Sequence, residues 1–315
     1  MSVSATRDSA SAAPAIHSIH EFVFSVPDLP EAERFYRAFG LDVRSEQRGL
    51  GLYTFGNAHR WGTVVEGERK QLQWVSLGIF EHDYTAFEVR LDAYGVKRIA
   101  APAGAVAEGL WIEGPDGVSI QLVVAEKCSP SRKSARSYPP ELADHGRAPC
   151  RSQVETVRPG HLSHILLFTR DVDRTRQFYA DVLGLRLSDH SGSIIAFMHS
   201  PHGSDHHLIA FAKSDGPGLH HTSWDVPSID HVALGSEQMA RAGFCQGWGL
   251  GRHVLGSNYF RYVRDPWGSY SEYSFDIDFI PAGMEWAAAD HPPEDSLYVW
   301  GPDVPSDFVL NYETR

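Results

Sequence analysis

Cysteine is scarce in this sequence. The 315 residues include three cysteines, Cys128, Cys150 and Cys245, and no two of them form a CxxC pair. A sparse, odd set of this kind argues against a disulfide framework and against a zinc–thiolate site. We therefore expect a protein of the reducing cytoplasm.

Long apolar runs and an excess of positive charge are also missing. No run reaches the roughly 18 apolar residues of a membrane-spanning helix. The formal net charge of -12 argues against electrostatic binding to nucleic acid. The first 16 residues are rich in Ser and Ala but lack the apolar core of a secretory signal, so they predict a disordered tail. Neither a membrane nor a nucleic acid is expected as a partner.

Two segments of the chain repeat one pattern. Residues 28–36 have the same spacing of Asp and Phe-Tyr as residues 171–179, and the turn 115–117 matches the turn 266–268. A repeat that occurs twice indicates a duplicated domain. Each copy alternates strand, helix and several strands twice over, which predicts two βαβββ modules in each copy and an α+β fold.

The expected elements follow from apolar periodicity and turn residues. Helices are predicted at 29–38, 83–93, 172–183 and 229–242. Strands are predicted at 20–27, 51–55, 63–65, 72–79, 96–100, 110–112, 118–124, 164–169, 194–198, 207–212, 221–226, 259–263 and 269–275.

These patterns divide the chain into five parts. Residues 126–159 are basic, rich in Ser and Pro and without apolar periodicity, which indicates an interdomain linker or, alternatively, an anion-binding segment. The Pro- and aromatic-rich stretch after residue 276 is expected to wrap the surface or cover a site. The predicted parts are a tail (1–16), a first, non-catalytic copy (17–125), the linker (126–159), a catalytic copy (160–283) and a C-terminal extension (284–315).

Histidines gather in the second copy, where 11 of the 17 lie between His161 and His253. Two consecutive pairs, 206–207 and 220–221, each open a run that is typical of a β-strand. Successive side chains of a strand point to opposite faces. Only one histidine of each pair is therefore expected to face a given cavity.

Three residues of the second copy are candidate metal ligands: His164, His221 and Glu272. Two histidines and a carboxylate can occupy one face of an octahedron and leave three positions open, which suits a non-haem Fe(II). A dispersed set like this is weakly specific, and ordinary polar residues are the alternative. Glu21 and Gln121 stand at the first copy's positions of His164 and Glu272. The second copy is therefore predicted to carry the metal, and the first to be structural.

Residues 160–276 resemble the catalytic domain of the type I extradiol dioxygenases of the vicinal oxygen chelate superfamily, and the first copy matches their N-terminal domain more loosely. The resemblance implies two tandem domains, each forming a curved open-barrel sheet around the site. The matching pieces are His164, Asp171, Phe178 to Gly184, His206-His207, Leu219 to His221, Gly251 to His253, Tyr262, Pro266 to Gly268, and Glu272-Tyr273.

The resemblance also implies residue roles and chemistry. It implies Fe(II), with Mn(II) as an alternative, a catechol-type diol and O2 as substrates, a 2-hydroxymuconate-semialdehyde-type product in aromatic catabolism, and a homo-oligomer. The implied metal ligands are His164, His221 and Glu272; the implied acid–base histidine is His207; and the implied pair near the substrate oxygens is His253 and Tyr262.

The remaining candidates are assigned more modest parts. Leu166 and Leu255 suggest that part of the substrate pocket is apolar. His206 and His220 are interpreted as packing or surface residues, with a place beside the pocket as the alternative for His220. His161 is a rival metal ligand, and the histidines expected to be solvated are His190, His199, His202 and His231.

Two other functions fit the same class of fold, because fold does not fix function. A glyoxalase-type isomerase predicts another carboxylate in place of one histidine ligand. A protein that only sequesters small molecules predicts neither a full ligand set nor an acid–base histidine. The presence of His207, His253 and Tyr262 argues against both.

Overall fold

The computed structural model of the chain describes residues 13–137, 146 and 148–314. Most of the predicted tail, residues 1–12, and part of the predicted linker therefore lie outside the described residues. Ala15 and Ile16, at the end of the predicted tail, are buried, and the Ile16 N–H donates to the carbonyl of Leu183 at 3.1 Å. No helix among the described residues is both long and apolar enough to cross a membrane.

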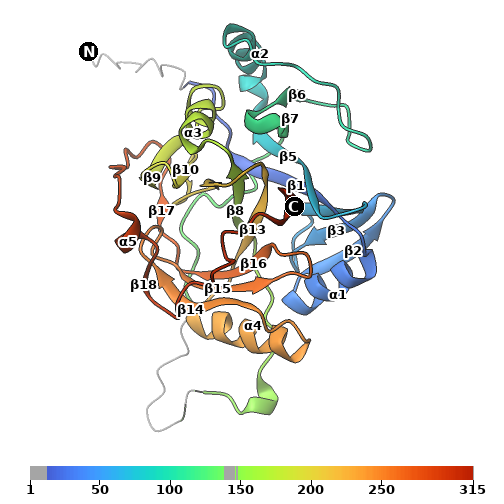
Figure 1. Ribbon diagram of the computed structural model, residues 1–315, viewed down its shortest axis with the longest axis vertical. Coiled ribbons are helices and arrows are strands. Elements are labelled where there is room, and N and C mark those ends of the chain that lie inside the picture. Colours follow the sequence, from blue (N-terminus) through green and yellow to red (C-terminus); the bar gives the residue numbers. More distant parts are fainter. Residues whose placement is uncertain (1–12, 138–145, 147, 315) are drawn as a thin grey trace, which may run out of the picture.

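The first copy forms a seven-stranded sheet in the order β2-β3-β4-β1-β5-β7-β6 (Figure 1). Its strands are β1 (Ser18–Val26), β2 (Asp42–Glu46), β3 (Gly49–Tyr53), β4 (Arg60–Glu66), β5 (Gln71–Ile79), β6 (Leu110–Glu113) and β7 (Ser119–Val124). Its helices are α1 (Leu29–Phe39) and α2 (Tyr84–Ala93), with the short 3-10 turns η1 (Glu81–Asp83) and η2 (Pro115–Gly117).

The second copy forms a nine-stranded sheet in the order β18-β14-β15-β16-β13-β8-β12-β10-β9. Its strands are β8 (Leu162–Thr169), β9 (Arg186–Ser191), β10 (Ile195–His199), β12 (Ile209–Lys213), β13 (Gly218–Asp225), β14 (Gly247–His253), β15 (Tyr259–Arg264), β16 (Tyr270–Phe275) and β18 (Tyr298–Trp300). The remaining elements are the pair β11 (Ser204–Asp205) and β17 (Phe279–Ile280), the helices α3 (Val172–Asp181), α4 (Ile229–Arg241) and α5 (Pro293–Ser296), and the turns η3 (Arg151–Gln153) and η4 (Tyr312–Thr314).

The strand orders confirm the predicted duplication. Each sheet has a central antiparallel pair, β1 with β5 and β8 with β13, and each of these four strands has a parallel neighbour on its other side. Both sheets curl into open half-barrels, which lie side by side in Figure 1. The α+β fold of two tandem domains, each a curved sheet, is therefore as expected.

The repeated helices begin for the same local reason. Asp28 and Asp171 are N-cap residues whose carboxylates accept the backbone N–H three residues later, each at 2.9 Å. This bond satisfies an N–H group that the first turn leaves without a partner. Gly40 ends α1 in the left-handed conformation, with φ of 98°, which favours glycine. The four predicted helices are confirmed to within two residues at each end.

The strand prediction at residues 96–100 is wrong. Only one isolated bridge, between Arg98 and Ile112, forms there. The corresponding strand of the second copy, β14, is covered on its outer side by β18 from the C-terminal extension, and the first copy has no such strand to complete its edge. The strands β2, β9, β14 and β18 were not expected; β14 contains three glycines, which are unfavourable in strands.

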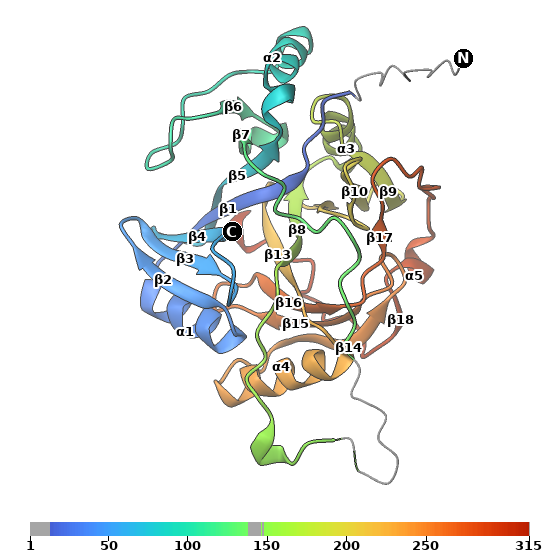
Figure 2. The ribbon, with the colours of Figure 1, turned by 180° about the vertical axis from the view of Figure 1, so that it is seen from behind.

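The two copies share one continuous apolar core. The rings of Phe39 on α1 and Tyr273 on β16 stack with centroids 3.9 Å apart, and the Tyr273 hydroxyl donates to the Phe39 carbonyl at 2.8 Å. The described part of the linker runs along the back of the molecule, past β13 to α4 (Figure 2). Within the described residues of 126–159 the turn η3 is the one regular element.

A buried ion pair fastens the first copy to the second and to the end of the chain. The Lys70 ammonium, between β4 and β5, lies 2.5 Å from the Glu313 carboxylate and donates to the Leu219 carbonyl at 2.7 Å. Glu313 also accepts the backbone N–H groups of Leu72 and Leu219, at 2.7 and 2.9 Å. Both side chains of the pair are nearly inaccessible to solvent.

We expect Lys70→Met to lower the free energy of unfolding by about 3–5 kcal/mol, because it leaves the Glu313 carboxylate buried without its counter-ion. Urea unfolding followed by circular dichroism measures the change. Lys97→Met is the matched control: it removes an exposed ion pair with Glu113 and should cost about 0–1 kcal/mol. Equal effects of the two substitutions would contradict the prediction.

Candidate metal centre

Three side chains converge on one face at the middle of the second sheet. His164 lies on β8, His221 on β13 and Glu272 on β16, which are neighbouring strands. Ser223 of β13 is paired with His164 on one side and with Glu272 on the other. Paired residues share a face, and so do residues two apart on one strand, which places His221 on that face too.

The ligand atoms lie at distances that suit one metal ion. Oε2 of Glu272 is 3.4 Å from Nε2 of His164 and 3.8 Å from Nε2 of His221. Potential ligand atoms of all three residues lie within 4.8 Å of one another. Metal bonds to imidazole and carboxylate are about 2.0–2.2 Å long, so two ligands at right angles around an ion lie about 3 Å apart.

Two of these atoms have no other partner. Among the residues that the structure describes, Nε2 of His221 and Oε2 of Glu272 are buried and form no hydrogen bond. A buried polar atom without a partner costs free energy, and a cation bound between these two would satisfy both. The residues present therefore fit a divalent metal ion.

The protonation states of the ligands suit the same purpose. Burial lowers the pKa of His221 well below its ordinary value, so the ring is neutral near pH 7, as metal binding requires. Burial alone would raise the pKa of Glu272, but the interaction with His164, whose Nε2 lies 3.4 Å away, lowers it. The site thus presents neutral imidazole and an ionised carboxylate.

Asn258 supports the carboxylate and was not foreseen from the sequence. This buried residue follows β14 and precedes β15, and its Nδ2 donates to Oε1 of Glu272 at 3.0 Å and to Oγ of Ser274 at 2.9 Å. These bonds leave Oε2 as the oxygen that faces His164 and His221. A lone Asn in a turn carries no sequence signal that distinguishes this part from an ordinary turn residue.

A narrow, mostly apolar cavity of about 90 Å³ opens beside the three ligands. His207 borders it, with its ring centroid 4.0 Å from that of His164. His207 is not one of the three residues whose atoms converge, as expected for a residue that does not bind the metal. All three residues named for the pocket, Leu166, His220 and Leu255, line this cavity.

His253 and Tyr262 lie together at the same cavity. Nε2 of His253 is 2.9 Å from the Tyr262 hydroxyl, and its Nδ1 is 2.7 Å from the carbonyl of Leu297. Because a carbonyl only accepts, Nδ1 donates to it, and Nε2 then accepts from the phenol. Burial, with the charge of Glu272, raises the pKa of Tyr262 well above its ordinary value. The phenol is therefore a neutral donor.

The C-terminal extension forms part of the cavity wall. Leu297, Phe308 and Val309 line it, next to Tyr262 and His220. The carbonyl of Leu297 contacts His253, and that of Phe308 contacts His220 at 2.7 Å. The stretch that was expected to wrap the surface or cover a site thus covers this one.

Strand alternation failed as a guide to the second histidine pair. His220 and His221 both border the cavity, because a bulge in the pairing of β13 with β8 falls between Leu219 and His221 and the extra residue breaks the alternation. His206 and His207 precede β12 and lie outside any strand. Their Nδ1 atoms are 3.1 Å apart, and His207 lines the cavity whereas His206 does not, as expected for this pair.

The other histidines agree with expectation only in part. His206 is buried and its Nε2 lies 2.8 Å from the Asp189 carboxylate, so of the two expected parts, packing or surface, it has the packing one. His199, expected to be solvated, is buried with its Nδ1 2.8 Å from Oγ of Ser188. His161, the rival ligand, lies 3.7 Å from the Asp225 carboxylate and outside the group of converging ligands.

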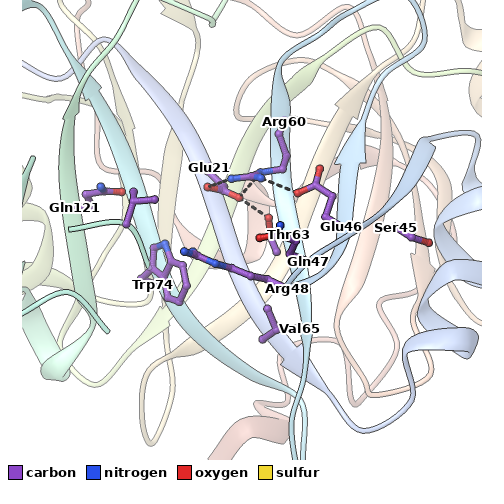
Figure 3. A pocket seen from close by; sticks show the side chains of 11 residues that line it. Glu21, Ser45, Glu46, Gln47, Arg48, Arg60, Thr63, Val65, Trp74 and Gln121 are labelled. Carbon is purple, nitrogen blue, oxygen red and sulfur yellow. Dashed lines mark hydrogen bonds and ion pairs between the residues drawn. The ribbon is translucent and has the colours of Figure 1, made fainter. Parts of the chain in front are cut away.

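The first copy has different residues at the equivalent face. Glu21 is paired with Ser76 as His164 is with Ser223, and Trp74 stands where the second copy has His221. Glu21 binds the Arg60 guanidinium at 2.8 Å, and Arg60 also binds Glu46 at 2.7 Å (Figure 3). The concave face of the first sheet, which we call the first cup, thus holds the guanidinium of Arg60 in ion pairs with Glu21 and Glu46.

Known proteins with similar sequences or structures point to the same kind of site. A family model described as Glyoxalase/Bleomycin resistance protein/Dioxygenase superfamily matches residues 161–273. Metapyrocatechase 2 of Cupriavidus necator is 50% identical over 299 residues, 95% of this chain and 93% of that protein. The Mn(II)-bound glyoxalase from Novosphingobium aromaticivorans is 23% identical, with a TM-score of 0.72 over 92% of each chain. An extradiol ring-cleaving dioxygenase from B. fuscum is 20% identical, with a TM-score of 0.74 over 95% of this chain and 83% of that one.

The duplicated sheets with a buried His–His–Glu centre define a metal-dependent enzyme of the glyoxalase, bleomycin resistance and dioxygenase superfamily. The two solved structures share its fold. The identity to Metapyrocatechase 2 extends over nearly the whole chain and narrows the class. The chain belongs to the type I extradiol ring-cleavage dioxygenases of this superfamily, as the family resemblance predicted.

We expect one metal ion per chain, and we expect His221→Ala to lose it, because the substitution removes one of three protein ligands. Elemental analysis after gel filtration measures the metal content. A second group of possible ligands, His20, His59 and Cys128, is partly exposed, and Nε2 of His59 already contacts the His20 carbonyl at 2.8 Å. Cys128→Ser is therefore the control and should keep the metal. Retention of metal by His221→Ala would refute the ligand assignment.

Proposed function

We propose that this enzyme opens the ring of a catechol-type diol with O2, next to the two hydroxyls, and that Fe(II) is held by His164, His221 and Glu272. The similarity to Metapyrocatechase 2 and to the ring-cleaving dioxygenase of B. fuscum supports the reaction class. The observation that carries the proposal is the position of His207: an acid–base side chain that lines the same cavity as the ligands His164 and His221 but is not among the three converging residues.

The metal, when bound, supplies a Lewis acid that makes a coordinated hydroxyl easier to deprotonate and a centre where the diol and O2 meet. Mn(II) suits the same ligands. Iron is proposed on family resemblance alone.

His207 is the proposed acid–base residue. Burial lowers its pKa well below the ordinary value, so its ring is neutral at pH 7 and has a nitrogen free to accept a proton. In the proposed reaction His207 takes the proton of the second diol hydroxyl and later returns a proton to the reacting oxygen.

His253 and Tyr262 are proposed to stabilise the substrate oxygens. The Tyr262 phenol stays neutral and is held by His253, whose own orientation is fixed by the Leu297 carbonyl. For this part the Tyr262 hydroxyl turns its O–H from His253 to the substrate oxygen, where a neutral donor stabilises developing charge.

The cavity wall favours an apolar ring substituent. Among the described residues that line it there is no Lys, Arg, Asp or Glu, and the wall includes Leu166, Phe197 and Leu255. A carboxylate on the substrate ring would be buried there without a partner, which is costly. We therefore propose alkyl-, chloro- or aryl-substituted catechols as substrates, and this proposal does not choose among them.

Location and assembly are proposed from the cysteines and from the family resemblance. The three cysteines are free thiols, which supports a reducing cytoplasm. A homo-oligomer is proposed from the family resemblance. The division into a first copy at 17–125 and a catalytic copy at 160–283 is likewise proposed, since the ligands all come from the second.

We expect the Fe(II)-loaded protein, prepared without oxygen and then mixed with catechols in air, to consume O2 and form a yellow ring-opened product. His207→Phe should keep the metal and lower kcat about 10²- to 10⁴-fold, the contribution of a positioned acid–base group. His231→Gln is the control, since His231 contacts Ser228 at the start of α4, away from the cavity. No O2 uptake across a broad catechol panel would defeat the proposed reaction.

Substituted catechols test the pocket separately. We expect kcat/KM for a methyl- or phenyl-substituted catechol to exceed that for a carboxylate-bearing catechol at least about 10-fold, since burial of an unpaired carboxylate costs more than 1.4 kcal/mol. Steady-state O2 uptake gives both constants. Equal kcat/KM values would show that the carboxylate finds a partner, and would refute the apolar pocket.

A further inference from the structure

The side chains of His206 and His207 touch beside the cavity. Their Nδ1 atoms lie 3.1 Å apart, and both residues are almost completely buried. A neutral imidazole has one donor nitrogen and one acceptor nitrogen, so one ring donates in this contact and the other accepts. The direction of this bond decides which nitrogen of His207 carries its proton.

The other side of His206 meets a carboxylate. Nε2 of His206 lies 2.8 Å from Oδ2 of Asp189, on β9. Oδ1 of Asp189 accepts the Ala289 N–H at 3.0 Å and lies 2.9 Å from Nε2 of His291. Burial would raise the pKa of Asp189, but these hydrogen bonds lower it to about 2. Asp189 is therefore ionised near pH 7 and can only accept.

The direction of the whole chain of hydrogen bonds follows. Because the Asp189 carboxylate accepts, Nε2 of His206 donates to it, and a His206 ring that carries one proton is left with Nδ1 as an acceptor. Nδ1 of His207 then donates to His206, and Nε2 of His207 carries no proton. Since Nδ1 is engaged with His206, Nε2 is the nitrogen available to the cavity that His207 lines.

We propose that Asp189 and His206 are positioning residues, which hold His207 in the tautomer whose unprotonated Nε2 serves the substrate. The inference rests on the proposed function, which gives His207 its acid–base part. When Nε2 of His207 accepts a proton, the ring becomes a cation, and the His206–Asp189 pair is already oriented to stabilise it. A buried carboxylate orients the histidine of Ser–His–Asp enzymes in a comparable way.

The second histidine pair is built on the same plan. Nε2 of His220 lies 2.7 Å from the carbonyl of Phe308, and its Nδ1 lies 2.7 Å from Nδ1 of His221. The carbonyl only accepts, so the same reasoning leaves Nε2 of His221 unprotonated. That nitrogen is the one that faces Glu272. In both pairs the first histidine contacts an oxygen acceptor, and the second presents a bare Nε2 to the site.

Aromatic packing holds the rings in these orientations. The centroid of the Phe197 ring lies 4.8 Å from that of His207, and the Trp286 ring lies 5.4 Å from His206, both nearly edge-on. The rings therefore have little room to turn over and exchange their nitrogens. The tautomer is set by the hydrogen bonds, and the packing keeps the nitrogens in place.

The tautomer can be measured without turnover, on the Zn(II)-loaded full chain labelled with 15N-histidine, by two-bond 1H–15N correlation spectra. We expect His207 to carry its proton on Nδ1, with its signals identified by their loss in His207→Phe. Asp189→Asn offers an amide N–H2 where the carboxylate accepted, so the proton of His207 should move wholly or partly to Nε2. A proton on Nε2 in the unsubstituted protein, or no change in Asp189→Asn, would overturn the proposal.

Steady-state kinetics distinguish a positioning role of Asp189 and His206 from a role in the fold alone. Asp189→Asn and His206→Leu should lower kcat about 10- to 100-fold, with KM and metal content unchanged. His206→Gln should recover most of the rate, because its amide can donate to Asp189 and accept from His207. Asp290→Asn is the matched control and should leave kcat unchanged. It makes the same Asp-to-Asn change next to Ala289, at a carboxylate that is 61% exposed and lies 3.5 Å from His190.

Two results in these assays would overturn the proposal: equal losses in His206→Leu and His206→Gln, or a loss of metal together with kcat. Either would mean that His206 only supports the fold. If the unsubstituted protein opens no catechol ring, the proposed function fails, whereas the tautomer spectra still decide the arrangement of Asp189, His206 and His207.

Discussion

The Glu272 carboxylate is completely buried, and the rest of the site depends on how that charge is satisfied. A buried carboxylate is costly unless hydrogen bonds or a cation compensate it. One oxygen is satisfied by Asn258, and the other is left facing His164 and His221. Strand β16 lies between β13 and β15. The two histidine ligands therefore approach the Glu272 carboxylate from one side, and Asn258 and the Tyr262 phenol approach it from the other.

Local signals were enough to predict much of the fold, whereas the three candidate ligands were chosen by residue type and by the family resemblance. Caps at Asp28 and Asp171, apolar periodicity and the repeated turns are short-range features, so the helices and the duplication could be predicted from the sequence. The bulge at His220 depends on register with β8, and the support from Asn258 depends on a contact across strands. Neither has a local signal, and for this reason strand alternation gave the wrong face for His220.

The two copies show that one sheet plan does not dictate one chemistry. Corresponding strands occupy corresponding places in both sheets. Trp74 replaces the neutral imidazole of His221, and Glu21 pairs with Arg60. A guanidinium is always charged at neutral pH, so the Arg60 side chain supplies a permanent positive charge on the concave face of the first sheet. The acidic groups of the first cup are thereby compensated, whereas the corresponding face of the second sheet leaves Oε2 of Glu272 without a partner.

The C-terminal extension completes the second copy in a way that the first copy lacks. The Leu297 carbonyl fixes His253, the Phe308 carbonyl fixes His220, and the Ala289 N–H holds Asp189. An imidazole is useful to a metal or a substrate only if the correct nitrogen is bare, and sequence alone does not state which one is. Here main-chain groups far along the chain make that choice. A duplicated half-barrel that acquired the three ligands but no such extension would hold its histidines near the metal without fixing their protons.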